Sequence, residues 1–548
     1  MMKGQCIGLT MLSLLISGAL SIQANAATVV SDTMISLSNH AGAVCNNGEP
    51  ANMQVTLVAD GAGVSNKWYV HLVGGGSCRD DASCQARWQG EAHNMRPLGS
   101  FPANGKLNLT RPAGAPFDGY NTVQIHYCSS DGWAGSKVGS VDGNGDPVVF
   151  NGTDTIVVDS AGSGEYAVHF RGKRILQAAF DELDTQYGVT TTATEVVVGG
   201  ISAGSVGVQT HIDKIDALFG PATNVRGLML DTWIPFLPLA GTETQVRSWL
   251  ANQGISAPTV DSLLRFANFD IEDNLAAGYD TTANVWGAFN NISTEGWPGP
   301  AACFESLENE PEVIANPSLL MLCTLHDYVL NKAFNDGSTP FISTDMLVLR
   351  NMYDFAVGLV AFGLFPDHEE FTDEDFADVI QDILSLQPLS ELRNYLDLET
   401  RNDVMVDSSS ELARAMYMLL LPVLQVSLEG AAASPNVTVF APFLEMTTEN
   451  CSIFNLPGCS FLEENRRAIP THGVVDAYAS STCAAGYALA LGANPFNVTC
   501  VNTFNGHLIQ PQGTTTLGKA RTIKEYLKGW AALDSQYDYD LIGDVKLP

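Results

Sequence analysis

Residues 195–205 read EVVVGGISAGS, and this stretch decides the fold class of the chain. The apolar run at 196–198 has the composition of a short buried strand, and a G-x-S-x-G sequence at 200–204 follows it directly. Residues 205–219 have helical periodicity, so Ser202 lies between a strand and a helix. A turn in that setting requires small neighbours and projects its serine from the edge of a sheet. The sequence therefore predicts that Ser202 is a catalytic nucleophile.

The segments around this turn alternate between strand-like and helix-like patterns. β-branched and aromatic residues predict strands at 53–58, 68–73, 122–127, 195–198 and 225–230. Helical periodicity predicts helices at 170–187 and 205–219. Strands that alternate with helices are typical of a mostly parallel sheet covered on both faces. Together with the serine turn, the pattern predicts an α/β fold of the α/β-hydrolase type.

The pattern changes between about residues 242 and 430. Strand signals nearly vanish there, and helical periodicity predicts helices at 317–334, 345–362, 373–386 and 409–424. Strand patterns return at 437–443 and 498–502, followed by a final helix at 517–533. We therefore expect a hydrolase core made of residues 27–241 and 431–548, with a large helical insertion at 242–430 before the penultimate strand. This insertion is expected to be a lid, with a separate domain as the alternative.

The first 26 residues have the features of a signal peptide. Lys3 precedes an apolar stretch at 7–22, and Ala24-Asn25-Ala26 supplies the small residues for cleavage before Ala27. No later segment has about eighteen uninterrupted apolar residues. We therefore expect a secreted protein, extracellular or periplasmic, with no membrane span after cleavage.

The cysteine content agrees with export. Of the eleven cysteines, Cys6 lies in the predicted signal peptide, and the remaining even number predicts up to five disulfides in an oxidising compartment. Short spacings suggest the pairs Cys78–Cys84 and Cys451–Cys459, whereas the full connectivity stays open. Metal binding is the alternative, but the sequence has no pair of C-x-x-C motifs, so we expect no metal.

The charge excludes one class of partner. The formal net charge is −33, from 60 acidic residues against 27 basic ones. Without a cationic surface to release counterions from phosphates, the chain is not expected to bind nucleic acid. Solubility in a salty exterior is the simplest explanation of this charge.

A second glycine-rich segment is a candidate oxyanion hole. The predicted strand at 68–73 runs into three glycines at 74–76, and glycine lets backbone amides approach a substrate oxygen closely. The start of the helix after Ser202 supplies further free N–H groups. We therefore expect the amides of Gly75 or Gly76, together with that of Ala203, to hold an oxyanion. A plain glycine turn is the alternative.

The general base is expected downstream of the serine. His507 lies between the predicted strand at 498–502 and the final helix, where this fold delivers its histidine. His472 is the rival.

The catalytic acid is expected on the loop after the predicted strand at 437–443, where it orients the imidazole and stabilises its positive form. Glu445 follows that strand, and Glu449 and Asp476 are the alternatives.

Five stretches of the chain resemble, in the same order, motifs of the pectin acetylesterase family, which includes the Notum-type lipid deacylases. They are GGGSC at 74–78 with Cys84 and Arg87 following, YCSSD at 127–131, FRGKRI at 170–175, GGISAG at 199–204 and LDTW at 230–233. The resemblance implies an extracellular α/β-hydrolase that removes acyl groups from oxygen without a cofactor. It also implies Ser202, an acid and His507 as catalytic residues, Gly75, Gly76 and Ala203 as oxyanion donors, and a Cys78–Cys84 bridge.

The sequence departs from this family in four places. Gly76 stands where the family usually has an aromatic residue, and Glu445 is the local match to an acid that is usually aspartate. The sequence around His507 has only weak similarity to the family's sequence around its histidine. The helical block at 242–430 is longer than in typical family members.

We therefore expect a serine carboxylesterase that hydrolyses O-acyl esters, first of all O-acetyl esters on a polysaccharide. A lipase or polyester-type hydrolase for longer acyl chains is the alternative. A secreted binding protein on an inactive hydrolase scaffold is a further alternative, from outside the enzymes.

Overall fold

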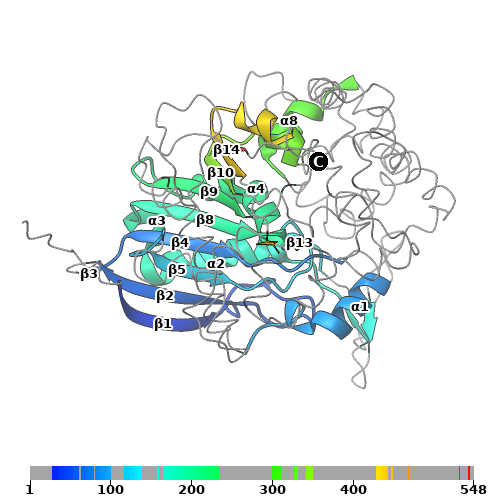
Figure 1. The fold of residues 1–548 in the computed structure, drawn as a ribbon. Coiled ribbons are helices and arrows are strands. Elements are labelled where there is room, and N and C mark those ends of the chain that lie inside the picture. Colours follow the sequence, from blue (N-terminus) through cyan, green and yellow to red (C-terminus); the bar gives the residue numbers. More distant parts are fainter. Residues whose placement is uncertain are drawn as a thin grey trace, which may run out of the picture.

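The computed structural model contains a large twisted sheet with helices packed against it (Figure 1). The described residues are 27–60, 63–78, 81–99, 116–138, 157–159, 165–230, 233, 299–311, 323, 326–330, 341–349, 427–441, 446–447, 467–468, 530 and 541–542. Within them the main sheet has ten strands.

The strand order of the sheet does not follow the chain. In spatial order the path is β1 (Thr28–Ser36), β2 (Asn52–Asp60), β5 (Asn121–Ile125), β4 (Lys67–Leu72), β8 (Glu195–Ile201), β9 (Asn224–Leu230), β10 (Asp345–Leu349), β11 (Val437–Ala441) and β14 (Leu541–Ile542), with β3 (Gly63–Val64) paired to β2. Every pairing from β5 to β14 is parallel, whereas β2 is antiparallel to β1 and to β5. The predicted mostly parallel α/β fold is confirmed.

The carboxyl ends of the central strands lie next to one another. Ile201 of β8 pairs with Leu230 of β9, and Leu230 pairs in turn with Leu349 of β10. On the other side of β8, Leu72 of β4 pairs with Gly200. These four strands therefore end at one edge of the sheet, which is where open α/β sheets bind their ligands.

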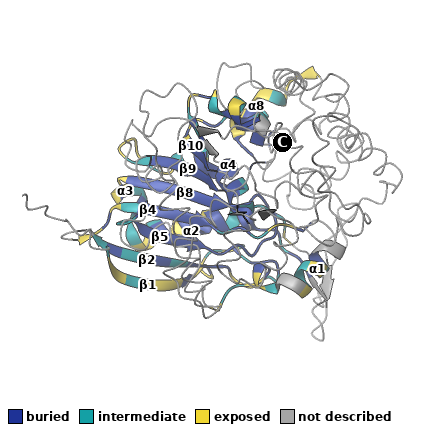
Figure 2. Cartoon of the chain, viewed as in Figure 1, coloured by how far each residue is buried: buried dark blue, intermediate teal, exposed yellow. Residues whose placement is uncertain are grey.

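Two helices cover one face of the sheet. The buried residues of α2 (Gly172–Tyr187) and α4 (Ala203–Asp216) form one apolar core with Trp68, Val70 and Leu72 of β4. Figure 2 shows the central strands almost entirely buried, whereas the edge strand β1 is largely exposed. Burial on both faces explains why the central strands are continuous apolar runs rather than alternating patterns.

The opposite face of the sheet is also covered. Tyr69 of β4 stacks on Phe117, with ring centroids 4.6 Å apart. Arg226 of β9 lies in the same register row as Tyr69, because both pair with Val197 of β8. The guanidinium carbon of Arg226 lies 4.5 Å from the ring centroid of Trp530, and its side chain forms an ion pair with Glu195 of β8. Trp530 falls within the predicted final helix and is itself helical, and its carbonyl accepts a hydrogen bond from Arg226.

Smaller elements complete the described chain. The helices are α1 (Asp81–Glu91), η1 (Ala92–Asn94), α3 (Val189–Thr192), α8 (Ala301–Leu307) and α10 (His326–Leu330). Two short hairpin-like sheets pair β6 (Val157–Asp159) with β7 (Glu165–Ala167), and β12 (Met446–Thr447) with β13 (Arg467–Ala468). None of the helices in the described ranges is long and apolar enough to cross a membrane.

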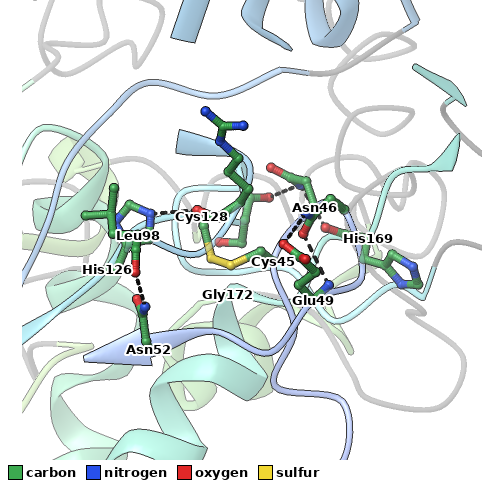
Figure 3. The surroundings of a disulfide bond; sticks show 12 residues. Cys45, Asn46, Glu49, Asn52, Leu98, His126, Cys128, His169 and Gly172 are labelled. Atoms are coloured by element: carbon green, nitrogen blue, oxygen red, sulfur yellow. Dashed lines mark hydrogen bonds between the residues drawn. A yellow bond between two sulfur atoms is a disulfide. The ribbon is translucent and has the colours of Figure 1, made fainter. Parts of the chain in front are cut away.

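The predicted bridge Cys78–Cys84 is confirmed. Two more disulfides, Cys45–Cys128 and Cys303–Cys323, join residues that are far apart in the sequence. Figure 3 shows how Cys45–Cys128 ties the loop after β1 to the end of β5. The pair Cys451–Cys459 lies outside the described residues.

One prediction about the segment 242–430 is wrong. Residues 345–349 were expected to begin a helix, but Asp345–Leu349 forms β10, a parallel strand between β9 and β11. The run Met346–Leu349 is uniformly apolar and buried, and such a short run fits a buried strand or a buried helix equally well. The helices α8 and α10 agree with a helical segment, whose boundaries remain a prediction.

Candidate active site

Ser202 occupies a sharp turn between β8 and α4, as the sequence predicts. β8 ends at Ile201 and α4 begins at Ala203, so the turn consists of the serine alone. Its backbone angles are φ 52° and ψ −123°, which are rare for a residue with a side chain. Ser202 is partly exposed, whereas both its neighbours are buried. The turn thus presents one hydroxyl at the edge of the sheet.

The glycines around Ser202 are required by space. A Cβ on Gly200 would lie 2.2 Å from the backbone of Gly204, and a Cβ on Gly204 would lie 2.0 Å from the carbonyl oxygen of Leu72. Side chains are therefore excluded on both sides of the serine, because the helix crosses directly over the strands that precede it.

The turn is also fixed to β9. The hydroxyl of Ser205 lies 2.7 Å from the carbonyl oxygen of Gly200 and accepts the N–H of Leu230 at 3.0 Å. The N–H of Ser202 donates to the carbonyl of Leu230 at 3.4 Å. These bonds join the serine turn to the neighbouring strand end.

The glycine run after β4 lies against the same turn. A Cβ on Gly74 would be 2.2 Å from the carbonyl oxygen of Ile201 and 3.0 Å from the Cβ of Ser202. Gly75 and Gly76 follow with φ of 157° and 66°, and Gly76 is exposed. The structure thus brings together Ser202, Ala203 and the glycine run, three of the predicted site components.

Aromatic side chains hold the carbonyl groups of this loop. The indole Nε1 of Trp133 donates to the carbonyl of Val73 at 3.1 Å, and the hydroxyl of Tyr127 donates to the carbonyl of Gly76 at 2.7 Å. Both side chains are fully buried. Burial raises the pKa of Tyr127, so its hydroxyl stays protonated and able to donate.

A buried carboxylate organises the segment that carries these aromatic residues. Asp131 accepts the hydroxyl of Ser129 at 2.6 Å, the N–H of Trp133 at 3.0 Å and the N–H of Gly172 at 2.7 Å. Burial raises the pKa of Asp131 to about 6, although these hydrogen bonds favour its charged form. Asp131 therefore joins the start of α2 to the segment at 129–133, which carries Trp133.

Two buried histidines near the site are structural. The Nε2 of His211 on α4 contacts the carbonyl of Trp133 at 2.8 Å, and that of His126 contacts the carbonyls of His93 and Arg96 at 2.9 and 3.0 Å. Burial lowers the pKa of His211 to about 3 and that of His126 to about 4, so both rings are neutral near pH 7. A neutral ring must carry its proton on Nε2 to donate to a carbonyl.

The remaining predicted site residues lie outside the described residues. These are the base His507 with its rival His472, and the acid Glu445 with its alternatives Glu449 and Asp476. Within the described part of the chain, no group of three or more His, Cys, Asp or Glu side chains could hold a metal ion.

Two features of this site were not predicted. Tyr127 was noted only as part of a motif, and Trp133 lies just beyond that motif, so neither was given a role. The signal was weak, because a buried aromatic residue usually serves the core. The strand β10 was also missed, and its last residue, Leu349, pairs with Leu230 at the end of β9.

The strand order and the serine turn define a protein of the α/β-hydrolase type. The sequence model of the pectinacetylesterase family matches residues 23–234, a range that contains Ser202, the glycine run and all five motif stretches. Over this part of the chain, the match agrees with the family resemblance predicted from the sequence.

Individual relatives agree with the family match. The palmitoleoyl-protein carboxylesterase Notum of Drosophila melanogaster is 29% identical over 225 residues, 38% of this chain and 30% of that protein. Pectin acetylesterase 11 of Arabidopsis thaliana is 26% identical over 188 residues, 34% of this chain and 41% of that protein. The match thus spans less than half the length of either relative.

A solved structure of the Wnt deacylase Notum from Drosophila is also similar. It is 19% identical with a TM-score of 0.41, and the alignment covers 76% of this chain and 84% of that one.

Proposed function

We propose that this chain is a secreted serine carboxylesterase that hydrolyses O-acyl esters, with Ser202 as the nucleophile. The observation that carries the proposal is the strained turn at Ser202, packed directly against the glycine run at 74–76. This arrangement places the serine directly before the first N–H groups of α4 and against Gly74 at the start of the glycine run, and backbone N–H donors near the nucleophile are what an acyl-transfer site requires. The names of both relatives describe ester hydrolases, which supports ester hydrolysis as the reaction class.

The proposed reaction has two steps. His507 accepts the proton of Ser202 as the serine oxygen bonds to the ester carbonyl carbon, and the amides of Gly75, Gly76 and Ala203 hold the resulting oxyanion. The C–O bond to the alcohol breaks, and the alcohol leaves with the proton from His507. Water then gives a proton to His507 and attacks the acyl-enzyme, and the released acid leaves as the proton returns to Ser202.

The position of β10 adds a candidate for the catalytic acid. Leu349 at the end of β10 pairs with Leu230, whose carbonyl accepts the N–H of Ser202. The first acidic residue after Leu349 in the sequence is Asp354, whereas Glu445 follows β11, one strand further from the serine. We therefore propose Asp354 and Glu445 as the two candidates for this role.

A Ser202→Ala variant tests the nucleophile. We expect hydrolysis of p-nitrophenyl acetate to fall by at least about 10⁴-fold, because the hydroxyl that forms the acyl-enzyme is gone. The thermal unfolding temperature should stay at the wild-type value, since the residue is partly exposed. Undiminished turnover in this variant would refute the proposal. Loss of labelling by a fluorophosphonate in the variant but not in the wild type separates the enzyme from an inactive scaffold.

The two acids are distinguished by Asp354→Asn and Glu445→Gln. The variant that removes the true acid should lose about 10³- to 10⁴-fold in kcat, because the imidazole then loses its orientation and charge partner. The other should change kcat by less than about 10-fold. Two unaffected variants would show that the acid lies elsewhere.

The proposal also has to specify the length of the acyl chain in the substrate. The names of the relatives specify an acetyl group on pectin in one case and a palmitoleoyl group on a protein in the other. We propose the acetyl ester of a polysaccharide. A series of p-nitrophenyl esters from acetyl to palmitoyl, with acetylated pectin beside it, tests this choice. A maximum at eight carbons or more would favour the lipase or polyester-type alternative.

The disulfides in the described chain support export, because such bonds persist in oxidising compartments. We propose that the mature protein is secreted and begins at Ala27, which N-terminal sequencing of exported protein would test.

A further inference from the structure

The glycine loop beside Ser202 is held at both of its ends by side chains from one segment, residues 127–133. At its start the carbonyl of Val73 accepts a hydrogen bond from the indole of Trp133 at 3.1 Å. At its end the carbonyl of Gly76 accepts one from the hydroxyl of Tyr127 at 2.7 Å. These two carbonyls belong to the peptide units 73–74 and 76–77. They bracket the two units between them, which carry the N–H groups of Gly75 and Gly76.

These two hydrogen bonds matter because the peptide units between them consist of glycine residues. Gly74, Gly75 and Gly76 have no side chains, so the peptide units between them rotate more freely than those of other residues. An oxyanion donor acts only when its N–H points at the place where the negative charge develops, and it must do so before the reaction. A flexible loop therefore needs an external support to serve as a donor.

Tyr127 supplies one support through a two-sided hydrogen bond. Its hydroxyl accepts the N–H of Gly132 at 2.7 Å while it donates to the carbonyl of Gly76. Its ring also lies under the loop, since a Cβ on Gly75 would be 3.1 Å from the ring. The hydroxyl cannot turn away from Gly76 without breaking the bond to Gly132.

Trp133 supplies the other support and links the loop to the nucleophile helix. Its carbonyl accepts a hydrogen bond from His211 of α4, and a Cβ on Gly207 of α4 would lie 2.7 Å from its side chain. α4 is the helix that begins directly after Ser202. One side chain thus touches both the helix of the serine and the start of the glycine loop.

The backbone of Trp133 is itself strained. Its φ is 67°, a conformation that is an outlier for a bulky aromatic residue. The N–H bond to Asp131 and the carbonyl bond to His211 hold it there. The rings of Tyr127 and Trp133 also pack together, with centroids 5.3 Å apart. Strain that the surroundings maintain at such a place is typical of a functional constraint.

We propose that Tyr127 and Trp133 are positioning residues, which fix the N–H groups of Gly75 and Gly76 toward the oxyanion formed at Ser202. This inference rests on the proposed function, and it adds two residues that do not touch the substrate. Their removal should slow the chemical step and leave ground-state binding nearly unchanged, because the donors act most strongly on the charged transition state.

The test compares Tyr127→Phe with a matched control, Tyr69→Phe. Both tyrosines are fully buried and each hydroxyl makes a hydrogen bond within the protein, but the hydroxyl of Tyr69 lies 3.2 Å from the Nδ1 of His71, on the strand rather than on the loop. Each variant removes one hydroxyl and keeps the ring. Tyr127→Phe removes two hydrogen bonds and Tyr69→Phe removes one, so thermal unfolding is measured for both and each loss of kcat is compared with the loss of stability.

For Tyr127→Phe we expect kcat for p-nitrophenyl acetate to fall by about 10-fold or more, with KM changed by less than about twofold. The rate of fluorophosphonate labelling should fall by a similar factor, because the phosphonyl oxygen occupies the same donors. An alkyl boronic acid, which forms a tetrahedral adduct with the serine, should bind more weakly by that factor as well. Tyr69→Phe should keep kcat and the labelling rate within about twofold of the wild type.

Equal losses of kcat in both variants, in proportion to their loss of stability, would overturn the inference, as would an unchanged kcat in Tyr127→Phe. If Tyr127→Phe does not fold, Trp133→Phe removes the other support, and the same measurements decide. An inactive Ser202→Ala together with an unaffected Tyr127→Phe would refute the positioning roles and leave the proposed function standing. A wild-type protein that neither turns over esters nor reacts with the fluorophosphonate would sink the proposed function and this inference with it.

Discussion

Three residues other than glycine have positive φ in the described chain, and all three lie at the site. Ser202 forms the turn, while Ser130 and Trp133 belong to the segment that supports the glycine loop. Each such conformation costs about 1–3 kcal/mol and persists only where the surroundings fix it. At this scale the site consists of a few strained residues held by glycine contacts and buried hydrogen bonds.

A buried histidine behind this site makes stability depend on pH. Burial holds the pKa of His211 at about 3, far below the value of about 6.5 expected in the unfolded chain. A lowered pKa in the folded state gives stability that is present above pH 6.5 and is lost as the pH falls from there toward 3. His126, with a pKa of about 4, acts in the same direction.

We therefore predict that the free energy of unfolding decreases below pH 6.5, with a contribution from His211 of about 1.4 kcal/mol per pH unit. Urea unfolding followed by tryptophan fluorescence between pH 7.5 and 4.5 measures this slope. His211→Gln keeps a side-chain donor for the carbonyl of Trp133 but cannot take up the proton. Its slope should be shallower by about that amount, and an unchanged slope would show that folding does not lower the pKa of His211.

At the scale of the elements, long-range links hold the loops at the catalytic edge. Asn46, next to Cys45, donates to the carbonyls of Ser129 and His169, and accepts the hydroxyl of Ser130 (Figure 3). The disulfide to Cys128 fixes the same region covalently. The segment that carries the two positioning residues is thus anchored from behind by the loop after β1.

The two longer disulfides give a comparison of loop lengths. Cys45–Cys128 spans 83 residues and Cys303–Cys323 spans 20, and all four cysteines are fully buried. Replacing the first pair by alanine should lower the free energy of unfolding by about 4.5 kcal/mol and the second by about 3 kcal/mol, because a longer closed loop restricts the unfolded chain more. Denaturant titrations of both double variants measure the difference. The reverse order would mean that local packing, not loop entropy, determines these costs.

At the scale of the whole molecule the dominant feature is charge. A net charge of −33 on one chain produces self-repulsion that opposes the compact state. Salt shortens the range of this repulsion, from about 30 Å at 0.01 M to about 3 Å at 1 M.

We predict that the unfolding temperature rises by a few degrees between about 0.01 M and 0.5 M sodium chloride, as measured by calorimetry. Potassium chloride should give the same shift, since the effect is one of screening. A temperature that stays constant or falls with salt would contradict the prediction, and a difference between the two cations would point to a specific cation site.

The sequence by itself determined the features that depend on neighbouring residues. The turn at Ser202 and the glycine at 200 follow from local sterics, because a side chain on Gly200 would meet the backbone of Gly204, and the short spacing of Cys78 and Cys84 suggested their bridge. The strands β2, β4, β5, β8 and β9 were predicted within a few residues of their bounds, since their composition differs clearly from that of the helices between them.

Only the tertiary structure decided what depends on distant residues. The run at 346–349 became a strand because β9 and β11 offer their edges to it, a fact that its own composition does not contain. The pairing of Cys45 with Cys128 and the contacts of Trp133 with Val73 and His211 likewise join segments that are distant in the sequence. Local patterns constrain single turns and elements, whereas the support of the glycine loop is a property of their packing.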